Sequence, residues 1–349
     1  MNKILTIIIP TYNMEKYLRR CLDSLIIDEE GMKQLEVLVI NDGSKDSSSQ
    51  IAHEYQDKYP DTYRVIDKEN GNYGSCINRG LKEATGKYVK VLDADDWFDT
   101  KNFRLYFSDL SKVDVDLVVN DFVIVNEKNV VTKKFKYGLP KGVITFDDRV
   151  RSSFNKNNFQ MHAATYRLQM LKDMGYKQTE GISYTDQEWI YTPLMHVSTL
   201  YYCDKNVYIY LVGREGQTMS GENRKKGIVQ NQRCVLRIMR DFANVSSVEN
   251  PCIKSYLADQ AIISLRTVYS AYLLKYDDIS VKDLEDFDSE LRAINPDFIR
   301  MADNIVIPCT CYHFIKYWHT AHKKPSSPSF KFNRVSSKIV LKLQRIIKG

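Results

Sequence analysis

The chain has 349 residues, of which 43% are hydrophobic and 27% are charged. This composition is typical of globular proteins and excludes an intrinsically disordered chain. No apolar run approaches the roughly 18 residues of a membrane-spanning helix, and the first residues lack the features of a signal peptide. Seven irregularly spaced cysteines favour reduced thiols in a cytoplasmic compartment over a disulfide scaffold.

The net charge of +6 is unevenly distributed along the chain. No acidic residue follows Asp303, whereas nine of the 50 Lys and Arg residues lie between Lys316 and Lys348. Residues 1–303 therefore carry 41 cations against 44 anions. A nearly neutral body with a basic tail indicates an anionic partner for the tail, either a membrane or a nucleic acid.

The first hundred residues predict strands that alternate with helices. Continuous apolar runs predict buried strands at residues 4–9, 35–40, 63–66 and 88–92. Apolar residues at helical spacing predict helices at 17–26, about 47–59 and 75–84, with Asp46 capping the second. This alternation is typical of βαβ units and a mainly parallel sheet.

After residue 100 the pattern loosens. A strand is predicted at 116–125, followed by a polar hairpin, short mixed elements at 160–215 with strands at 200–202 and 207–210, and helices from about 224 to 320. Residues 325–329 read as a linker. The expected organisation is a nucleotide-sugar-binding half at 1–100, an acceptor-side half at 101–220, a helical region at 221–324, and a linker with a basic helix at 325–349.

Polar groups and turn formers follow each predicted strand of the first half. The segments are Pro10-Thr11-Tyr12-Asn13, Asn41-Asp42-Gly43-Ser44, Lys68-Glu69-Asn70-Gly71 and Asp93-Ala94-Asp95-Asp96. In an open parallel sheet, ligands bind at the carboxyl ends of the strands, so these segments predict one site. Neither a Gly-x-Gly-x-x-Gly fingerprint nor a P-loop is present.

Three aspartates within residues 93–96 would repel one another unless a cation or a proton lies between them. A divalent ion completed by phosphate oxygens meets this requirement. The alternative is an acidic turn that caps a helix starting near Trp97.

Together these motifs resemble the family 2 glycosyltransferases of GT-A fold. The resemblance covers residues 4 to about 100 and rests on Ile7–Asn13, Asn41–Asp46, Glu69–Gly71, Asn78–Tyr88 and Leu92–Trp97. It implies a mixed α/β, Rossmann-like fold and an inverting, metal-dependent transfer of a sugar from a nucleoside diphosphate.

The resemblance also implies roles for individual residues. Tyr12 would stack on the nucleobase, and Asp42, beside Gly43, would accept a hydrogen bond from a ring N–H of uracil. Asp93 would contact the ribose or the metal, and Asp95 would coordinate Mn²⁺ or Mg²⁺. The remaining donor-site residues are Pro10, Thr11, Ser44, Asn70, Ala94 and Arg214. The structural alternatives are a core tyrosine at Tyr12 and a turn-forming Asp42, and Asp96 is expected to cap the next helix.

An inverting transferase also needs a base for the acceptor hydroxyl. The family places it in an acidic pair before an aromatic residue, and the matching stretch is Glu180–Trp189. Thr185 replaces the usual glutamate, so Asp186 is the expected base, with Glu188 left open. The alternative is a carboxylate favoured by a helix N-terminus. Further on, Tyr208–Tyr210, Arg214 and Ser220 resemble the family's closing pattern, in which Arg214 would contact the diphosphate.

Processive synthases of this family carry a Gln-x-x-Arg-Trp motif, which residues 230–234 do not complete, so transfer of a single sugar is expected. The six histidines are scattered, and none, His162 included, is assigned a role.

The tail from Arg334 to Lys348 predicts an amphipathic helix. Its apolar residues, Val335, Ile339, Val340, Leu343, Ile346 and Ile347, fall within an arc of about 140° opposite the cations. This pattern is typical of a helix in an anionic membrane interface, with residues 331–349 as the attachment. The alternative is a helix docked on the body with its cations outward.

The predicted function is transfer of one hexose or N-acetylhexosamine from a UDP-sugar to a carbohydrate or lipid-linked glycan, in the cytoplasm or at the inner face of the cell membrane. One alternative is the same fold with a GDP-sugar or another donor. A second is a non-catalytic nucleotide-sugar-binding protein. A nucleic-acid partner is disfavoured because only the tail is basic.

Overall fold

The structure is a computed structural model that describes residues 2–214, 225, 227–276, 279–326 and 328–348. The chain divides into two compact units. The first comprises Met1–Arg224 and Ser247–Tyr256, and the second comprises Lys225–Ser246 and Leu257–Gly349. Among the described residues, no helix combines the length and the apolar character that crossing a bilayer requires.

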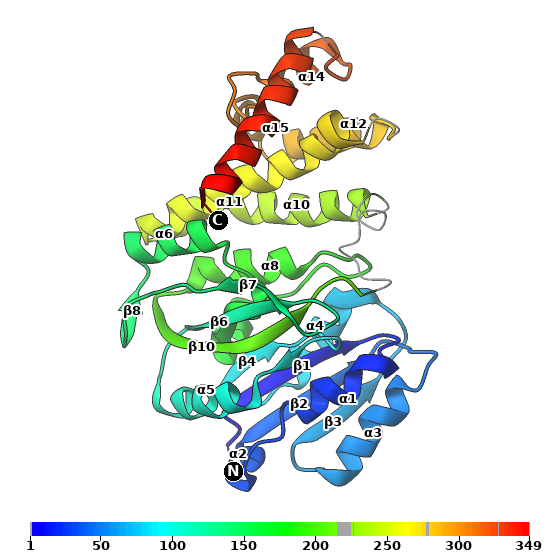
Figure 1. The fold of residues 1–349 in the computed structure, drawn as a ribbon, viewed down its shortest axis with the longest axis vertical. Helices are drawn as coiled ribbons and strands as arrows, with labels where there is room; N and C mark the ends of the chain where they lie inside the picture. Colours follow the sequence, from blue (N-terminus) through cyan, green and yellow to red (C-terminus); the bar gives the residue numbers. More distant parts are fainter. Residues whose placement is uncertain (1, 215–224, 226, 277–278, 327, 349) are drawn as a thin grey trace. The chain divides into compact units, whose positions relative to one another are not determined.

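The described strands of the first unit form one mixed sheet, which confirms the predicted α/β class (Figure 1). The strand order is β3-β2-β1-β4-β9-β6-β10-β5, with β7 paired to β6 and β8 paired to β10. The strands are β1 Leu5–Thr11, β2 Leu35–Asn41, β3 Tyr63–Asp67, β4 Tyr88–Val91, β5 Trp97–Phe98, β6 Leu117–Val125, β7 Val131–Phe135, β8 Val143–Thr145, β9 Ala164–Arg167 and β10 Thr199–Leu211.

The N-terminal half of the sheet is parallel. β2 lies between β1 and β3, and β1 lies between β2 and β4, with Ile7 opposite Val37 and Ile9 opposite Val39. Every residue of β2 is buried, because helices cover both faces of the sheet. This explains the continuous apolar runs in the sequence. The parallel direction also places the residues after β1, β2, β3 and β4 at one edge.

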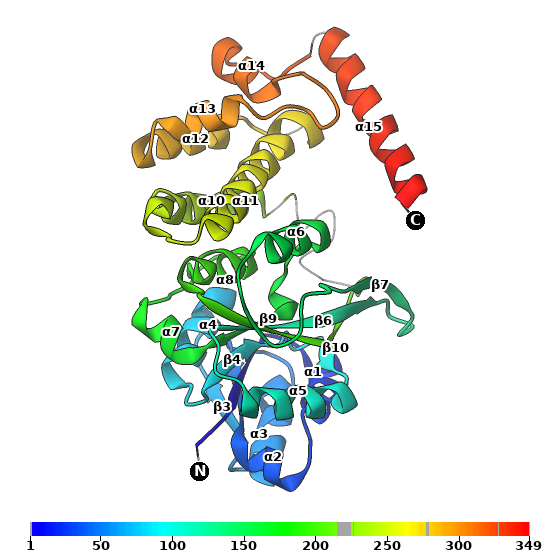
Figure 2. The ribbon, with the colours of Figure 1, turned by 90° about the vertical axis from the view of Figure 1, so that its left-hand side faces the viewer.

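Helices cover the two faces of the parallel half in the order that right-handed crossovers require. α1 and α3 lie over one face and α4 lies over the other (Figure 1, Figure 2). α4 approaches β1 closely, since a Cβ on Gly80 would lie 2.6 Å from the Ile8 side chain. The helices of this unit are α1 Glu15–Asp23, α2 Glu29–Gln34, α3 Ser48–Lys58, α4 Asn72–Glu83, α5 Thr100–Lys112, α6 Asp148–Asn157, α7 Leu168–Asp173 and α8 Asp186–Tyr191, with short 3₁₀ turns η1 Met161–Ala163 and η2 Pro193–His196. A third 3₁₀ turn, η3 Val245–Ser247, lies where the chain returns from the second unit to the first.

Three local predictions differ from the structure. The expected cap of the next helix by Asp96 is wrong, because α5 begins at Thr100 and Asp99 caps it by accepting a hydrogen bond from Asn102 N at 2.8 Å. α4 begins at Asn72 rather than at residue 75. The two short strands predicted at 200–210 are one strand, β10, whose pairing with β6 shifts register between Cys203 and Tyr208.

The second unit is helical over its described residues, as predicted. It contains α10 Ile228–Phe242, α11 Pro251–Ser270 (whose first residues, to Tyr256, belong to the first unit), α12 Lys282–Ile294, α13 Asp297–Asp303, α14 Phe314–Ala321 and α15 Pro328–Lys348, with a π-helical turn at Ala271–Lys275. A buried polar group organises its core, because Asp288 accepts hydrogen bonds from Tyr269 Oη and from Trp318 Nε1.

Candidate functional site

Residues after β1, β2 and β3 line a hollow of about 470 Å³. The predicted donor-site residues Tyr12, Gly43 and Asn70 all lie on its wall, and the other lining residues are Asn41, Lys45, Asp67, Lys68 and Glu69. Tyr12 is 46% exposed, so its ring is available to a ligand and is not part of the core. The three strand ends therefore meet at one concave surface.

Asp42 lies beside this hollow with only 3% of its surface exposed. Its Oδ1 accepts a hydrogen bond from Gly71 N at 3.0 Å and pairs with the Lys68 ammonium group. Its carbonyl oxygen accepts a hydrogen bond from Asn70 Nδ2 at 3.0 Å. The carboxylate is therefore held in one orientation. Sequence analysis missed Lys68, because a lysine after a strand carries no pattern of its own.

The other predicted donor-site residues shape the loops around the hollow. Thr11 is buried, and its carbonyl oxygen accepts a hydrogen bond from Asp42 N at 2.8 Å, while Pro10 precedes it within β1. Ser44 Oγ accepts a hydrogen bond from Asn13 N at 3.0 Å, and this ties the loop after β1 to the loop after β2.

The acidic cluster follows β4. Tyr73 donates its hydroxyl to Asp93 Oδ1 at 2.8 Å, and burial, followed by the charge of Asp95, raises the pKa of Asp93 to about 7. Asp96 is fully buried and accepts hydrogen bonds from Tyr208 Oη at 2.7 Å and Leu211 N at 2.8 Å. Burial, and then Asp95, raises the pKa of Asp96 well above its ordinary value. The cluster thus resists carrying its full negative charge without a cation.

Asp95 and Arg214 form an ion pair between two predicted site residues. The Arg214 guanidinium also lies 5.4 Å from the centre of the Tyr17 ring. Ala94, between Asp93 and Asp95, is buried. Ser220, which belongs to the same predicted motif as Arg214, lies outside the described residues.

His162 joins the cluster from a distant part of the chain. One of its ring nitrogens and one carboxylate oxygen each of Asp93 and Asp96 all lie within 4.8 Å of one another. The ring is 7% exposed, and its Nδ1 has no hydrogen-bond partner among the described residues. Burial lowers the pKa of His162 to about 3, so the imidazole is neutral. No sequence pattern distinguished this histidine from the other five.

Asp186 opens α8, as predicted, and its side chain is exposed. Its charge raises the pKa of Asp93, so the two carboxyl groups interact across the site. The protein atoms around it raise the pKa of Asp186 itself to about 6. Glu188 is instead 1% exposed, and its Oε2 accepts a hydrogen bond from Thr179 N at 2.8 Å. Glu188 thus supports the loop, whereas Asp186 is open to a ligand.

The loop that carries Asp186 packs on the N-terminal half of α4. Gly181 N donates to Gly71 O at 3.1 Å, and Asn78 Nδ2 donates to Gln178 O at 3.0 Å. A Cβ on Gly74 would lie 2.1 Å from Thr179 O, so a glycine is required for this approach.

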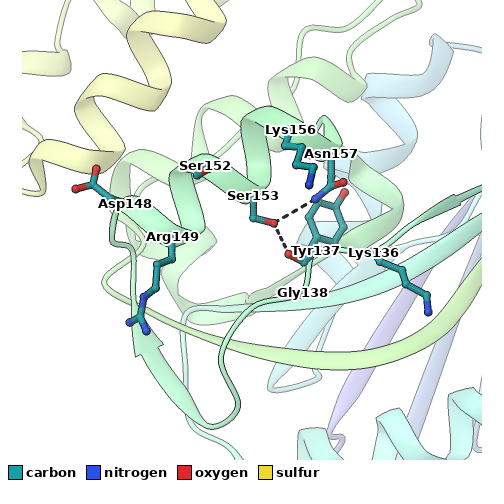
Figure 3. A pocket seen from close by; sticks show the side chains of 9 residues that line it. All are labelled: Lys136, Tyr137, Gly138, Asp148, Arg149, Ser152, Ser153, Lys156 and Asn157. Carbon is teal, nitrogen blue, oxygen red and sulfur yellow. Dashed lines mark hydrogen bonds between the residues drawn. The ribbon is translucent and has the colours of Figure 1, made fainter. Parts of the chain in front are cut away.

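A second hollow, of about 610 Å³, lies at α6 and the segment after β7 (Figure 3). It is lined by Lys136, Tyr137, Gly138, Asp148, Arg149, Ser152, Ser153, Lys156 and Asn157. Ser153 Oγ donates to Tyr137 O and accepts a hydrogen bond from Asn157 Nδ2 at 3.4 Å. None of the predicted site residues lines it.

Comparisons with known proteins agree with this geometry. A family model described as glycosyl transferase family 2 matches residues 6–175. An uncharacterised glycosyltransferase of Mycoplasma genitalium is 30% identical over 230 residues, which cover 64% of this chain and 73% of that protein. The poly(ribitol-phosphate) β-N-acetylglucosaminyltransferase TarS of Staphylococcus aureus is 27% identical over 216 residues, 62% of this chain but only 36% of TarS.

A solved structure extends the likeness to the whole fold. The crystal structure of residues 1–349 of S. aureus TarS in complex with UDP-GlcNAc superposes with a TM-score of 0.63 at 20% identity. The match covers 91% of this chain and 87% of that chain. The likeness therefore includes the helical region as well as the sheet.

Proposed function

The chain belongs to family 2 of the glycosyltransferases, and we propose that this enzyme transfers one hexose or N-acetylhexosamine from a UDP-sugar to a carbohydrate or lipid-linked glycan, with inversion. One observation carries the proposal. The N-terminus of α4 contacts both halves of the site, since Gly71 N, at the N-cap, donates to Asp42 and Tyr73 Oη, in the first turn, donates to Asp93. The hollow beside Asp42 and the acidic cluster are therefore parts of one site.

The hollow beside Asp42 suits a nucleoside. Tyr12 presents an exposed ring for stacking, and Asp42 supplies a fixed acceptor for the uracil N–H. The structure of TarS in complex with UDP-GlcNAc supports uracil rather than guanine as the base of the donor. Arg214 would bind the diphosphate of the donor. The diphosphate would then compete with Asp95 for the Arg214 guanidinium group.

The acidic cluster suits Mn²⁺ or Mg²⁺. The pKa values of Asp93 and Asp96 are both raised, and the buried His162 beside them has a ring nitrogen without a hydrogen-bond partner among the described residues, so the donor set fits a cation. We propose Asp93 and Asp95 as ligands, with Asp95 released from Arg214 when the donor binds. When bound, the ion would offset the negative charge that develops on the departing diphosphate.

Asp186 is the proposed base. It would accept the proton of the acceptor hydroxyl while that oxygen attacks the anomeric carbon from the side opposite the diphosphate. A pKa of about 6 leaves the carboxylate ionised at neutral pH and makes it a stronger base than an ordinary aspartate. Its exposed side chain in the first turn of α8 leaves room for an acceptor.

Peripheral attachment to an anionic membrane through residues 331–349 is a further part of the proposal. On α15, the apolar residues Phe332, Val335 and Ile339 are 73%, 57% and 54% exposed, whereas Phe330 and Ser337 are buried. These exposed apolar side chains support a membrane-facing surface on α15. Leu343, Ile346 and Ile347 lie outside the side chains that the structure describes.

Flotation with vesicles tests this attachment. The full chain should float with vesicles that contain phosphatidylglycerol and not with pure phosphatidylcholine. Phe332→Ser with Val335→Ser should abolish flotation. If this double variant floats like the unchanged chain, α15 is not the attachment.

Thermal-shift measurements with nucleoside diphosphates and their sugars, with and without Mn²⁺, test the donor and the metal. We expect UDP compounds to stabilise the chain more than GDP compounds, and more strongly with Mn²⁺. Asp95→Asn should remove the Mn²⁺ effect, with Asp286→Asn, an exposed aspartate of α12, as the control. A larger shift with GDP-sugars would instead favour the alternative donor.

Donor-dependent release of UDP tests the reaction. Asp186→Asn should bind the donor normally and lose transfer by at least a hundredfold, the scale of general-base catalysis. Binding without turnover in the unchanged chain would favour a nucleotide-sugar-binding protein. Transfer that survives in Asp186→Asn would move the base elsewhere.

A further inference from the structure

His162 lies where a third metal ligand would be. It belongs to η1, directly before β9, and β9 pairs with β4, the strand that ends at the acidic cluster. One ring nitrogen lies within 4.8 Å of a carboxylate oxygen of Asp93 and of one of Asp96. Two carboxylates and an imidazole therefore converge from two distant segments of the chain.

The imidazole is buried with one ring nitrogen left without a hydrogen bond among the described residues. It is 7% exposed, and its Nδ1 has no hydrogen-bond partner among the described residues. A buried histidine that serves only the core normally donates or accepts at its ring nitrogens, because an unpaired polar group is costly to bury. The His162 ring lies beside the carboxyl groups of Asp93 and Asp96. A metal ion bound by these three side chains would give the ring nitrogen a partner.

The ring and its backbone are held in place before any ligand binds. The ring stacks on Tyr210 with 4.4 Å between centres, and it meets Tyr208 edge-on at 4.8 Å. The carbonyl oxygen of His162 accepts hydrogen bonds from Lys90 Nζ at 2.9 Å and Asn120 Nδ2 at 3.3 Å. These contacts fix the position of the ring beside the two carboxyl groups.

The carboxylates of Asp93 and Asp96 have lone pairs left to coordinate a cation. Asp93 Oδ1 accepts a hydrogen bond from Tyr73, and the two oxygens of Asp96 accept one each, from Leu211 N and from Tyr208. Each carboxylate oxygen has two lone pairs, so these hydrogen bonds orient both groups and leave acceptor sites open.

We propose that His162 coordinates the divalent ion together with Asp93 and Asp96, and that it makes the site selective for Mn²⁺ over Mg²⁺. Imidazole is a good ligand for first-row transition metals and a poor one for Mg²⁺, which prefers oxygen. The inference rests on the proposed metal dependence and deepens it. Asp93 is common to both proposals, and Asp96 and His162 would add to the Asp93 and Asp95 ligands of the proposed function rather than replace Asp95.

The test is electron spin echo modulation of Mn²⁺ bound to the full chain in the presence of UDP, which detects directly coordinated nitrogen. Unchanged protein should show coupling to one imidazole nitrogen, and labelling the histidines with ¹⁵N should change that coupling. His162→Gln should lose the signal and bind Mn²⁺ at least tenfold more weakly, with Mg²⁺ affinity unchanged. His196→Gln, at an exposed histidine of the same unit, should behave as the unchanged chain.

The outcomes separate this inference from the proposed function. Mn²⁺ that binds to the unchanged chain without nitrogen coupling overturns the role of His162 and leaves the metal-dependent function intact. An unchanged chain that binds no Mn²⁺, with or without UDP, overturns both. The labelling result needs no variant and shows whether a histidine coordinates the ion, and among the described residues His162 is the histidine that lies in the acidic cluster.

Discussion

Tyr73 donates its hydroxyl to Asp93 Oδ1 at 2.8 Å, across a distance of 20 residues in the sequence. Tyr73 lies in the first turn of α4 and Asp93 follows β4, the next strand. This bond joins the helix that also supports Asp42 to the acidic cluster. Removal of the Tyr73 hydroxyl therefore tests whether this contact is needed for transfer.

Tyr73→Phe removes only this hydroxyl. A hydrogen bond to a charged group contributes about 1.5–3 kcal/mol, so kcat/KM for transfer should fall by roughly tenfold to a hundredfold. Steady-state kinetics of UDP release measure the effect. The matched control is Tyr166→Phe, because the buried Tyr166 hydroxyl has no partner among the described residues. Equal kinetics for the two variants would contradict a role for Tyr73 in orienting Asp93.

The pH profile of transfer should report Asp186. The protein atoms around its carboxyl group raise the pKa of Asp186 to about 6, and a base must be ionised, so kcat/KM should rise with pH through about 6 and then level off. An ordinary aspartate would place this limb near pH 4. UDP affinity, measured by calorimetry over the same pH range, serves as the control because it does not require the base. A limb near pH 4 would contradict the raised pKa of Asp186, and a limb that persists unchanged in the residual activity of Asp186→Asn would show that another group accepts the proton.

Gly74→Ala should displace the loop that carries Asp186. The added Cβ would lie 2.1 Å from the backbone oxygen of Thr179, so the loop must shift. We expect kcat to fall at least tenfold, together with a stability loss of about 1–3 kcal/mol. Gly80→Ala is the control, because its Cβ meets the Ile8 side chain in the core, away from the loop. Gly80→Ala should lower the melting temperature and leave kcat nearly unchanged. A similar loss of kcat in both variants would contradict an effect through the loop that carries Asp186.

The second unit should lose stability as pH rises, because of His319. Burial alone would lower the pKa of His319, but hydrogen bonds and charges from Asp288 and Asp303 outweigh it, so the pKa is raised above 6.5. The protonated histidine therefore stabilises the fold fully below pH 6.5, and this contribution disappears as pH rises through the higher folded pKa.

Hydrogen exchange of α12 and α14 at several pH values measures this effect. In the unchanged chain, protection should decline as pH rises, after correction for the intrinsic exchange rate. His319→Gln should flatten the decline, whereas His53→Gln, at a partly exposed histidine of α3, should not. Retention of the full decline in His319→Gln would show that another group causes it.

Much of the fold could be predicted because its signals are local. Runs of apolar residues gave the strands β1 to β4, and turn formers marked the strand ends where Tyr12, Asp42 and Asp93 lie. Errors occurred where tertiary contacts decide the outcome. Asp96 resembles a helix cap by position, but Tyr208 and Leu211 of β10 bind it instead.

The alternation of strands and helices in the first hundred residues and the family motifs could be read from the sequence alone. The residues at the donor edge followed from them, because parallel strands direct their carboxyl ends to a common edge. Only the tertiary structure decided that Lys68 would pair with Asp42, that Tyr73 would hold Asp93, and that His162 would reach the acidic cluster. Each of these contacts joins residues of different elements, and the energy of a buried polar group depends on which partners the packed fold brings to it.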